Sequence, residues 1–139
     1  MTLRQKIYWH KSNPPPQAFK VKWQDAVEEM IVATKNKGQG HAFNHELGQR
    51  HNVIETPICM GNERFNHPTQ KPEALFEPII KFWSRQEAVI LDPFCGTGTV
   101  CVVAKKLGRN YVGIELNPKY VELARKRLEA VPPRLDTFL

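Results

Sequence analysis

Glycines and a carboxylate stand together in the segment Asp92–Thr99, which reads DPFCGTGT directly after the apolar run 88–91. A short apolar run followed by glycines is typical of a buried strand that ends in a turn. Glycine lets a ligand approach the backbone, and free N–H groups at the start of a following helix attract a negative group. The segment therefore predicts a ligand site that accepts an anion.

A second carboxylate lies farther along the chain, at the end of the next apolar run. Glu115 closes the next apolar run, 111–114, and follows Gly96 by 19 residues. In nucleotide-binding folds, an acidic residue about 20 residues after the glycine turn takes the ribose hydroxyls. The pair predicts a nucleoside site. The alternative is an ordinary strand-turn-helix with an acidic residue at the end of the next strand.

The residue types also bear on which nucleoside binds. A dinucleotide loop would have a third glycine where this chain has Cys101, and Asp92 would repel a pyrophosphate. S-adenosylmethionine instead carries an ammonium, a sulfonium and a carboxylate. Asp92 can face its cationic part while the helix start takes its carboxylate. This pattern favours S-adenosylmethionine over NAD or FAD.

Composition narrows the class of protein. The 139 residues suit a single domain, and a net charge of +6 with a pI near 9.4 favours a polyanionic partner. No apolar run approaches the ~20 residues that cross a bilayer, and the first residues do not read as a signal peptide. Three cysteines, an odd number, argue for reduced thiols. We expect a cytoplasmic protein without a membrane partner.

The elements that must position these residues fall into two parts, 1–66 and 67–139. The first part predicts strands at 6–10 and 27–34, a polar loop over 35–50 and an edge strand within 52–59, where Pro57 restricts pairing.

The second part is more regular. It predicts a helix over 72–84 with a kink at Pro78, a fully buried strand at 88–91, a helix over 100–107, a second buried strand at 111–114 and a helix over 118–130. Two buried strands joined by a helix imply a parallel crossover. The predicted fold class is α/β, a partial doubly wound (Rossmann-like) sheet with added N-terminal strands.

At this level of detail the chain resembles a known family. The strings HPTQKP at 67–72, DPFCGTGT at 92–99 and GIELN at 113–117, followed by Tyr120, resemble the DNA amino-methyltransferases that make N6-methyladenine or N4-methylcytosine. Upstream, WHKSNPPP at 9–16 resembles the family's W-x-K-x-N-P-x-P segment, in the order of the subgroup that places the catalytic half before the cofactor half.

The resemblance assigns roles by position. It implies a pocket for S-adenosylmethionine formed by Thr69, Lys71, Asp92, Phe94, Gly96, Thr97, Gly98, Thr99, Glu115, Leu116 and Asn117. Within this pocket Thr69 and Lys71 would lie near the cofactor carboxylate, Glu115 would bind the ribose, and Leu116 and Asn117 would flank the adenine. Lys11 and Asn13 are weaker candidates for contacts with double-stranded DNA. We expect no metal site.

One family feature is missing. The catalytic tetrapeptide, an Asp, Asn or Ser followed by Pro-Pro and an aromatic residue, positions the amino group of a flipped base. The nearest match, Asn13–Pro16, has proline in place of the aromatic. The resemblance thus implies a cofactor-binding half that needs a catalytic half in trans or forms a homodimer. A noncatalytic remnant, and a methyltransferase for RNA or another amine, remain alternatives.

Overall fold

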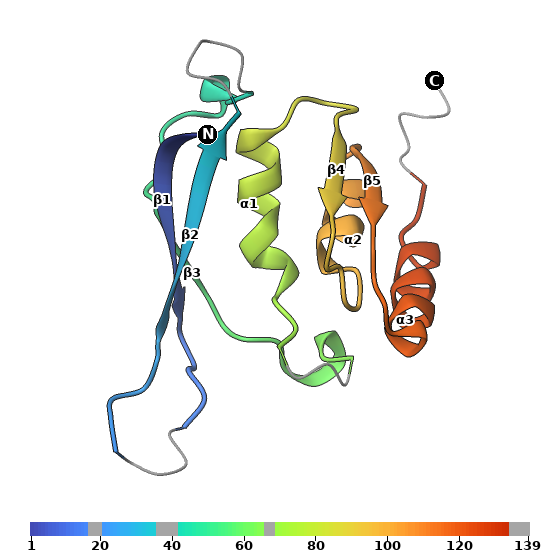
Figure 1. Cartoon of the computed structure of the whole chain (residues 1–139), viewed down its shortest axis with the longest axis horizontal. Helices are drawn as coiled ribbons and strands as arrows, with labels where there is room; N and C mark the ends of the chain where they lie inside the picture. Colours follow the sequence, from blue (N-terminus) through green and yellow to red (C-terminus); the bar gives the residue numbers. More distant parts are fainter. Residues whose placement is uncertain (17–20, 36–41, 66–68, 134–139) are drawn as a thin grey trace.

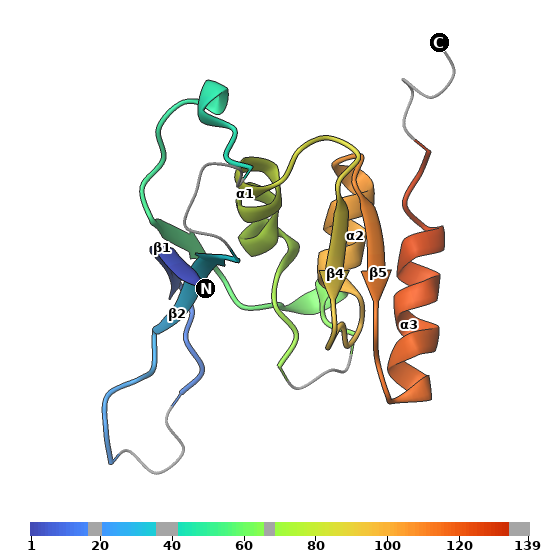
Figure 2. The same ribbon diagram turned by 45° about the horizontal axis from the view of Figure 1, so that its top comes forward.

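The structure is a computed structural model that describes residues 1–16, 21–35, 42–65 and 69–133. It places helix α1 between a three-stranded sheet and a two-stranded sheet, with helices α2 and α3 beside the latter (Figure 1; Figure 2). His67 and Pro68 of the HPTQKP string, positions 36–41 of the expected polar loop, and the expected boundary after residue 66 lie outside the described residues.

The N-terminal sheet has the order β2-β1-β3. Strand β1 (Thr2–Lys11) pairs antiparallel with β2 (Val27–Thr34) and parallel with β3 (Val53–Thr56). The strands predicted at 6–10 and 27–34 are therefore confirmed. β1 begins four residues earlier than predicted because its first residues pair with the end of β2. β3 lies at the sheet edge and ends before Pro57, as that proline requires.

This sheet buries one face against α1. Ile7 and Trp9 are two residues apart on β1 and therefore point to the same face of the sheet. They cluster there with Ile54 of β3 and Leu75 of α1. Trp9 is almost fully buried, and its indole Nε1 donates to the hydroxyl of Thr56 at 2.8 Å. Burying a tryptophan with its polar atom paired fixes the position of the helix on the sheet.

The C-terminal part follows the predicted order of elements. It consists of α1 (Glu73–Trp83), β4 (Val89–Asp92), α2 (Thr99–Lys106), β5 (Asn110–Gly113) and α3 (Pro118–Glu129). β4 and β5 pair in parallel, as the crossover predicted, with Asp92 opposite Gly113. Gly108 follows α2 with a φ of 73°, which explains why that helix ends there. α1 continues through Pro78.

The strands were expected to be fully buried, and this prediction is wrong. Val89 and Leu91 of β4 are 64% and 59% exposed, and Val112 of β5 is 48% exposed. α2 covers the face that carries Ile90 and Tyr111. Within the described residues the opposite face is largely open, so the alternate side chains of both strands reach solvent, and Val112 borders a cavity that α3 also lines. The strands of the described residues form two separate sheets, one of three strands and one of two.

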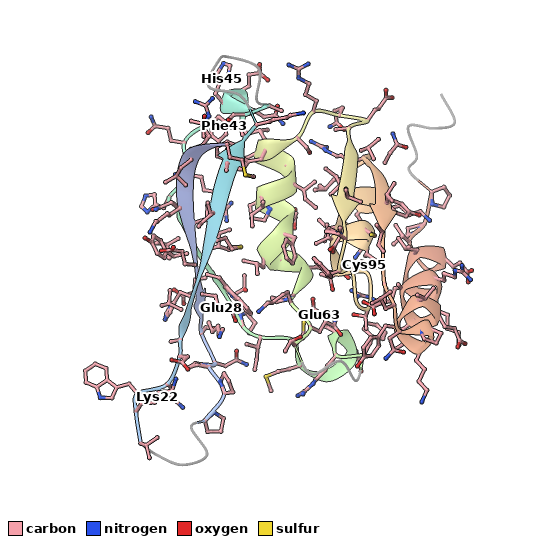
Figure 3. All side chains as sticks on the ribbon, viewed as in Figure 1. Lys22, Glu28, Phe43, His45, Glu63 and Cys95 are labelled. Carbon is pink, nitrogen blue, oxygen red and sulfur yellow. The ribbon has the colours of Figure 1, made fainter. Side chains whose placement is uncertain are left out.

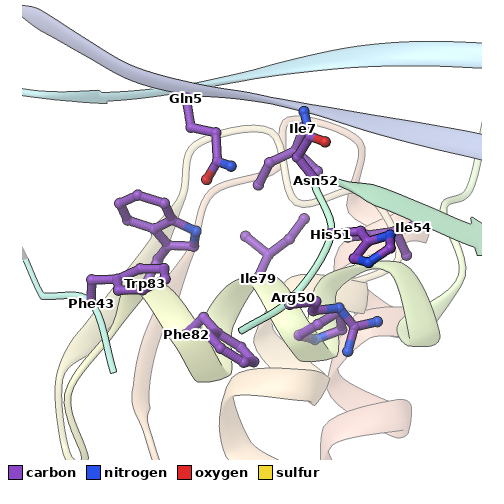
Figure 4. Close-up of a pocket in the computed structure, with 11 residues that line it drawn as sticks. Gln5, Ile7, Phe43, Arg50, His51, Asn52, Ile54, Ile79, Phe82 and Trp83 are labelled. Carbon is purple, nitrogen blue, oxygen red and sulfur yellow. The ribbon is translucent and has the colours of Figure 1, made fainter. Parts of the chain in front are cut away.

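The predicted polar loop holds a short 3-10 turn at His45–Leu47 and is tied to α1. The side-chain amide of Asn44 donates to the carbonyls of Lys81 and Ser84 at the end of that helix, at 2.6 and 2.8 Å. A cavity of about 80 Å³ lies between this loop, β1 and α1, with the Phe43 ring 4.8 Å from that of Trp83 (Figure 4). Its small size suits a packing gap.

None of the helices in the described part of the chain combines the length and the apolar character that a bilayer crossing requires.

Candidate functional site

A large cavity, called the main cavity below, lies where the glycine turn after β4 faces α1. Its volume is about 570 Å³, within the range of small-molecule sites. Phe76, Ile79 and Ile80 of α1 supply an apolar wall. The polar and backbone groups come from the residues predicted as a pocket, namely Thr69, Lys71, Asp92, Phe94, Gly96, Thr97 and Thr99. The structure therefore brings seven predicted residues together around one cavity.

The glycine turn has a backbone that other residues adopt poorly. Gly96 and Gly98 have φ values of 51° and 79°, in the left-handed region. Gly98 is also the N-cap of α2, and a Cβ there would lie only 2.8 Å from the Cβ of Ala124 on α3. Gly98 thus permits both the turn and the close approach of α3. The turn directs the start of α2 toward the cavity.

Two carboxylates flank this turn. Asp92 lines the cavity, and its Oδ1 accepts from the Phe94 N–H at 3.1 Å. Glu115 accepts from the Gly96 N–H at 2.9 Å with Oε2 and from the Asn117 N–H at 2.8 Å with Oε1. Burial raises the pKa of the Cys95 thiol between them, and both carboxylates raise it further. This end of the sheet is therefore a negative edge that attracts cations.

Glu115 and its neighbours lie around the cavity and not in its lining. Glu115 lines an adjacent cavity of about 320 Å³ between β5 and α3. Leu116 is 96% exposed, and Asn117 is the N-cap of α3, where its side-chain oxygen accepts from the Lys119 N–H at 3.0 Å. Gly98 likewise serves as a helix cap. Gly98, Glu115, Leu116 and Asn117 thus lie near the carboxyl ends of β4 and β5 but do not line the main cavity.

Lys71 links the cavity to the N-terminal sheet. Its Nζ lies 2.5 Å from Oε2 of Glu28 on β2, whose Oε1 lies 2.9 Å from Nζ of Lys11. Partial burial would raise the pKa of Glu28, but the hydrogen bonds from the two lysines outweigh it and lower the pKa. Glu28 is labelled on the strand in Figure 3. Lys71 thus stands at the boundary between the main cavity and a smaller one of about 280 Å³ that Trp9 lines.

The two weaker DNA-contact candidates make contacts within the protein. Lys11 is buried and, besides Glu28, its Nζ donates to the Asp25 carbonyl at 3.1 Å. Asn13 accepts from the Ile58 N–H at 2.8 Å and so ties the end of β1 to the segment after β3. Both side chains are engaged in holding the fold.

Arg127 is an important residue that the motifs did not reveal. It is buried, and its guanidinium donates to the Thr97 carbonyl at 2.8 Å and pairs with Glu73 at 2.9 Å. A signal was present, because Tyr120, Ala124 and Arg127 follow the i, i+4, i+7 spacing of one helix face. A charged residue on a face that packs inward must find partners.

Gln70 of the HPTQKP string also plays a part that its position did not reveal. Its side-chain oxygen accepts from the Phe65 N–H at 3.0 Å, and its amide donates to the Glu63 carbonyl. Glu63, labelled in Figure 3, in turn accepts from the Glu73 N–H at 2.8 Å with its carboxylate. These bonds fix the segment before α1 as one wall of the cavity.

Metal ligation finds no support in the described ranges, where no three His, Cys, Asp or Glu side chains come together as ligands. Cys101 is buried in α2, and burial raises the pKa of its thiol to about 12. The cysteines contribute packing here.

Comparisons with known proteins agree with this geometry. A family model described as DNA methylase, of the N6/N4 type, matches residues 1–126. The Type II methyltransferase M.HinfI of Haemophilus influenzae is 38% identical over 141 residues, covering 91% of this chain and 39% of the relative. The Type II methyltransferase M2.DpnII of Streptococcus pneumoniae is 40% identical over 134 residues, covering 89% of this chain and 50% of the relative.

Solved structures show the same fold. The SAM complex of M1.HpyAVI superposes with a TM-score of 0.81 at 34% identity, over 91% of this chain and 62% of that one. The cytosine-N4-specific PvuII DNA methyltransferase gives a TM-score of 0.76 at 21% identity, over 88% and 50%, which supports the Rossmann-like fold alone. The chain spans less than two thirds of each of these four proteins. With a family match over most of its length, it belongs to the N6/N4 DNA methylase family.

Proposed function

We propose that the main cavity binds S-adenosylmethionine. The observation that carries this proposal is that one cavity attracts both a cation and an anion. The Asp92 carboxylate attracts the cation, and the start of α2 at Thr99 attracts the anion. A cofactor with a cationic and an anionic end fits such a cavity, and the apolar wall from α1 suits its uncharged parts. The M1.HpyAVI structure, a SAM complex on the same fold, supports the proposal.

The residues around the cavity then have expected tasks. Asp92 faces the ammonium and sulfonium, the start of α2 takes the carboxylate, and Thr69 with Lys71 closes that end. Glu115 binds the ribose, because its carboxylate lies just after β5 beside the glycine turn, 2.9 Å from the Gly96 N–H, and a carboxylate accepts hydrogen bonds from sugar hydroxyls. Leu116 and Asn117 flank the adenine. When bound, the cofactor supplies a methyl group activated by the sulfonium.

The proposed reaction is methyl transfer to the exocyclic amino group of adenine (N6) or cytosine (N4) in DNA. The names of the relatives and the net charge of +6 support DNA as the substrate. Because the chain carries no Pro-Pro-aromatic tetrapeptide, we assign it the cofactor half, in the subgroup whose catalytic half comes first. Its odd number of cysteines supports a location in the cytoplasm. The missing tetrapeptide also favours a second candidate, a noncatalytic module that binds the cofactor or DNA.

The exposed face of β4 and β5 supports a partner for catalysis. Val89, Leu91, Val112 and Ile114 are each about half exposed or more; the first three lie on one face of the two strands, and Ile114 directly follows β5. Apolar area of this kind is stabilised by burial at about 25 cal/mol per Å². We propose that a catalytic half in trans, or a second copy, covers it. Light scattering over a wide concentration range should find an assembly, whereas a monomer throughout would exclude the homodimer.

The binding proposal is tested by calorimetry. The pure chain should bind S-adenosylmethionine and S-adenosylhomocysteine but not NAD. Glu115→Gln should weaken binding about tenfold, because a hydrogen bond to a charged acceptor contributes about 1.5–3 kcal/mol. Glu122→Gln is the matched control, since Glu122 is exposed on α3 and pairs with Lys126. Absence of binding by the unmodified chain would refute the proposal.

Catalysis requires a separate assay. Transfer of labelled methyl groups to DNA should appear when a chain that carries the tetrapeptide is added, and RNA in competition should not reduce it. Cofactor binding without transfer under both conditions would favour the noncatalytic module.

A further inference from the structure

Arg127 extends from α3 beneath the glycine turn. Its side chain is only 6% exposed, and its guanidinium carbon lies 4.7 Å from the centre of the Phe65 ring. A buried arginine is costly unless its donors are used. Here the guanidinium donates both to the turn and to the first residue of α1, so it contacts the structural supports of two cavity walls.

The contact with the turn involves two threonine hydroxyls. Nη1 of Arg127 lies 3.3 Å from Oγ1 of Thr97 and 3.1 Å from Oγ1 of Thr99, in addition to the Thr97 carbonyl. A guanidinium has five donors and no acceptor, so each hydroxyl oxygen accepts from it and turns its own hydrogen elsewhere. Both threonines line the main cavity. In the part of the chain that the structure describes, neither hydroxyl donates to a protein acceptor.

The contact with α1 fixes the opposite wall. Nη2 of Arg127 lies 2.9 Å from Oε1 of Glu73, the first residue of the helix that follows the segment with Thr69 and Lys71. The other oxygen of Glu73 lies 2.6 Å from Nζ of Lys106, which is half exposed. One buried guanidinium therefore contacts both the glycine turn and the start of α1, while Lys106 pairs with the same Glu73 carboxylate from outside.

We propose that Arg127 is a positioning residue for a ligand carboxylate. By donating to Thr97 and Thr99, it makes both hydroxyls donors toward the cavity, beside the start of α2 where the carboxylate of S-adenosylmethionine is placed above. This inference rests on the proposed cofactor binding and adds to it. Arg127 reaches the ligand only through the two threonines, because its ion pair with Glu73 lies on the protein side, so its effect falls mainly on ligands that carry the carboxylate.

The test compares two ligands by calorimetry. S-adenosylhomocysteine carries the amino acid group, and 5′-methylthioadenosine keeps the nucleoside and sulfur without it. In Arg127→Lys, a single ammonium replaces the guanidinium that contacted both the glycine turn and Glu73. We expect affinity for S-adenosylhomocysteine to fall about tenfold and affinity for methylthioadenosine to change by less than about twofold. Lys106→Met, which removes the exposed partner of the same Glu73, should change neither affinity by more than about twofold.

A merely structural role would weaken both ligands equally, and that outcome overturns the proposal. If Arg127→Lys fails to fold, Thr99→Val decides, because it removes one hydroxyl and keeps the shape of the side chain. A loss confined to S-adenosylhomocysteine supports the proposal, and unchanged affinity for both ligands overturns it. If the unmodified chain binds neither ligand, the proposed function itself fails, which is a different result from an equal loss in the variant.

Discussion

The two sheets of this chain use their faces differently. The N-terminal sheet buries one face on α1, and its outer face carries polar contacts such as Lys6 with Glu29, at 3.2 Å. The two-stranded sheet also buries one face, on α2, but its other face is apolar, with Val89 and Leu91 exposed. The outer face of the first sheet is therefore mixed, because exposed Ile31 and Val53 lie beside these charged groups. The second needs a cover that the described residues do not supply.

The difference shows how the site is divided. The glycine turn and Asp92 belong to the second sheet, whereas the partner of Lys71, Glu28, belongs to the first. α1 joins them, with Leu75 facing the N-terminal sheet and Ile80 facing α2. The N-terminal sheet therefore supports the cavity wall that α1 and Lys71 form. In the described part of the chain, no residue of its three strands lines the cavity. The stability of the cavity depends on both contacts of α1.

The largest expected effect tests whether the two regions unfold together. Leu75→Ala and Ile80→Ala each remove a buried side chain, 1% and 6% exposed, from opposite sides of α1. Each should lower the free energy of unfolding by about 3 kcal/mol. If α1 couples the regions, urea unfolding should show one transition that both substitutions shift. Leu116→Ala, at an exposed position, should change it by less than about 0.5 kcal/mol. Two transitions, each moved by one variant, would contradict the coupling.

A smaller effect separates the glycine turn from the N-terminal loop. Gly98 and Gly48 both have a left-handed φ, 79° and 87°, but an added Cβ meets Ala124 at 2.8 Å only at Gly98, while at Gly48 it meets open space. Gly48→Ala should cost about 1–2 kcal/mol, because a φ of 87° with a ψ of −170° is a conformation that is essentially confined to glycine. Gly98→Ala should cost about 2–3 kcal/mol because overpacking is added. Chemical denaturation measures both, and equal costs would show that α3 yields at the turn.

Sequence patterns predicted the second region better because its signals are local. Gly98, Gly108 and Pro118 each mark a helix boundary through their own backbone preferences, and the structure confirms these boundaries to within one or two residues. The seven predicted residues that line the cavity were found because all of them fall within the segment 92–99 or the string that precedes α1, where spacing along the chain translates directly into spacing in the fold.

What the sequence did not reveal depends on distant pairs. Lys71 meets Glu28 across 43 residues, and Arg127 meets Glu73 across 54. No local period encodes such pairs, although a charged residue on the inner face of α3 was a hint. Exposure of β4 was missed for a related reason, since an apolar run shows that a strand can be buried on both faces but not whether anything covers them.

The smallest expected effect concerns Glu28, which joins the first region to the second. Its pKa in the folded protein lies below the ordinary 4.5, so its ion pairs with Lys71 and Lys11 contribute stability above about pH 4.5 and lose it as the pH falls through the lowered value. The contribution is below about 1 kcal/mol because the side chain is 38% exposed and water screens it. Unfolding of the unmodified chain should therefore lose slightly more stability than Glu28→Gln between pH 7 and pH ~3.5. Glu29→Gln, on the outer face of the same strand, is the control and should follow the unmodified chain. A Glu28→Gln profile that parallels the unmodified one would show that Lys71 is held by its backbone and not by the first sheet.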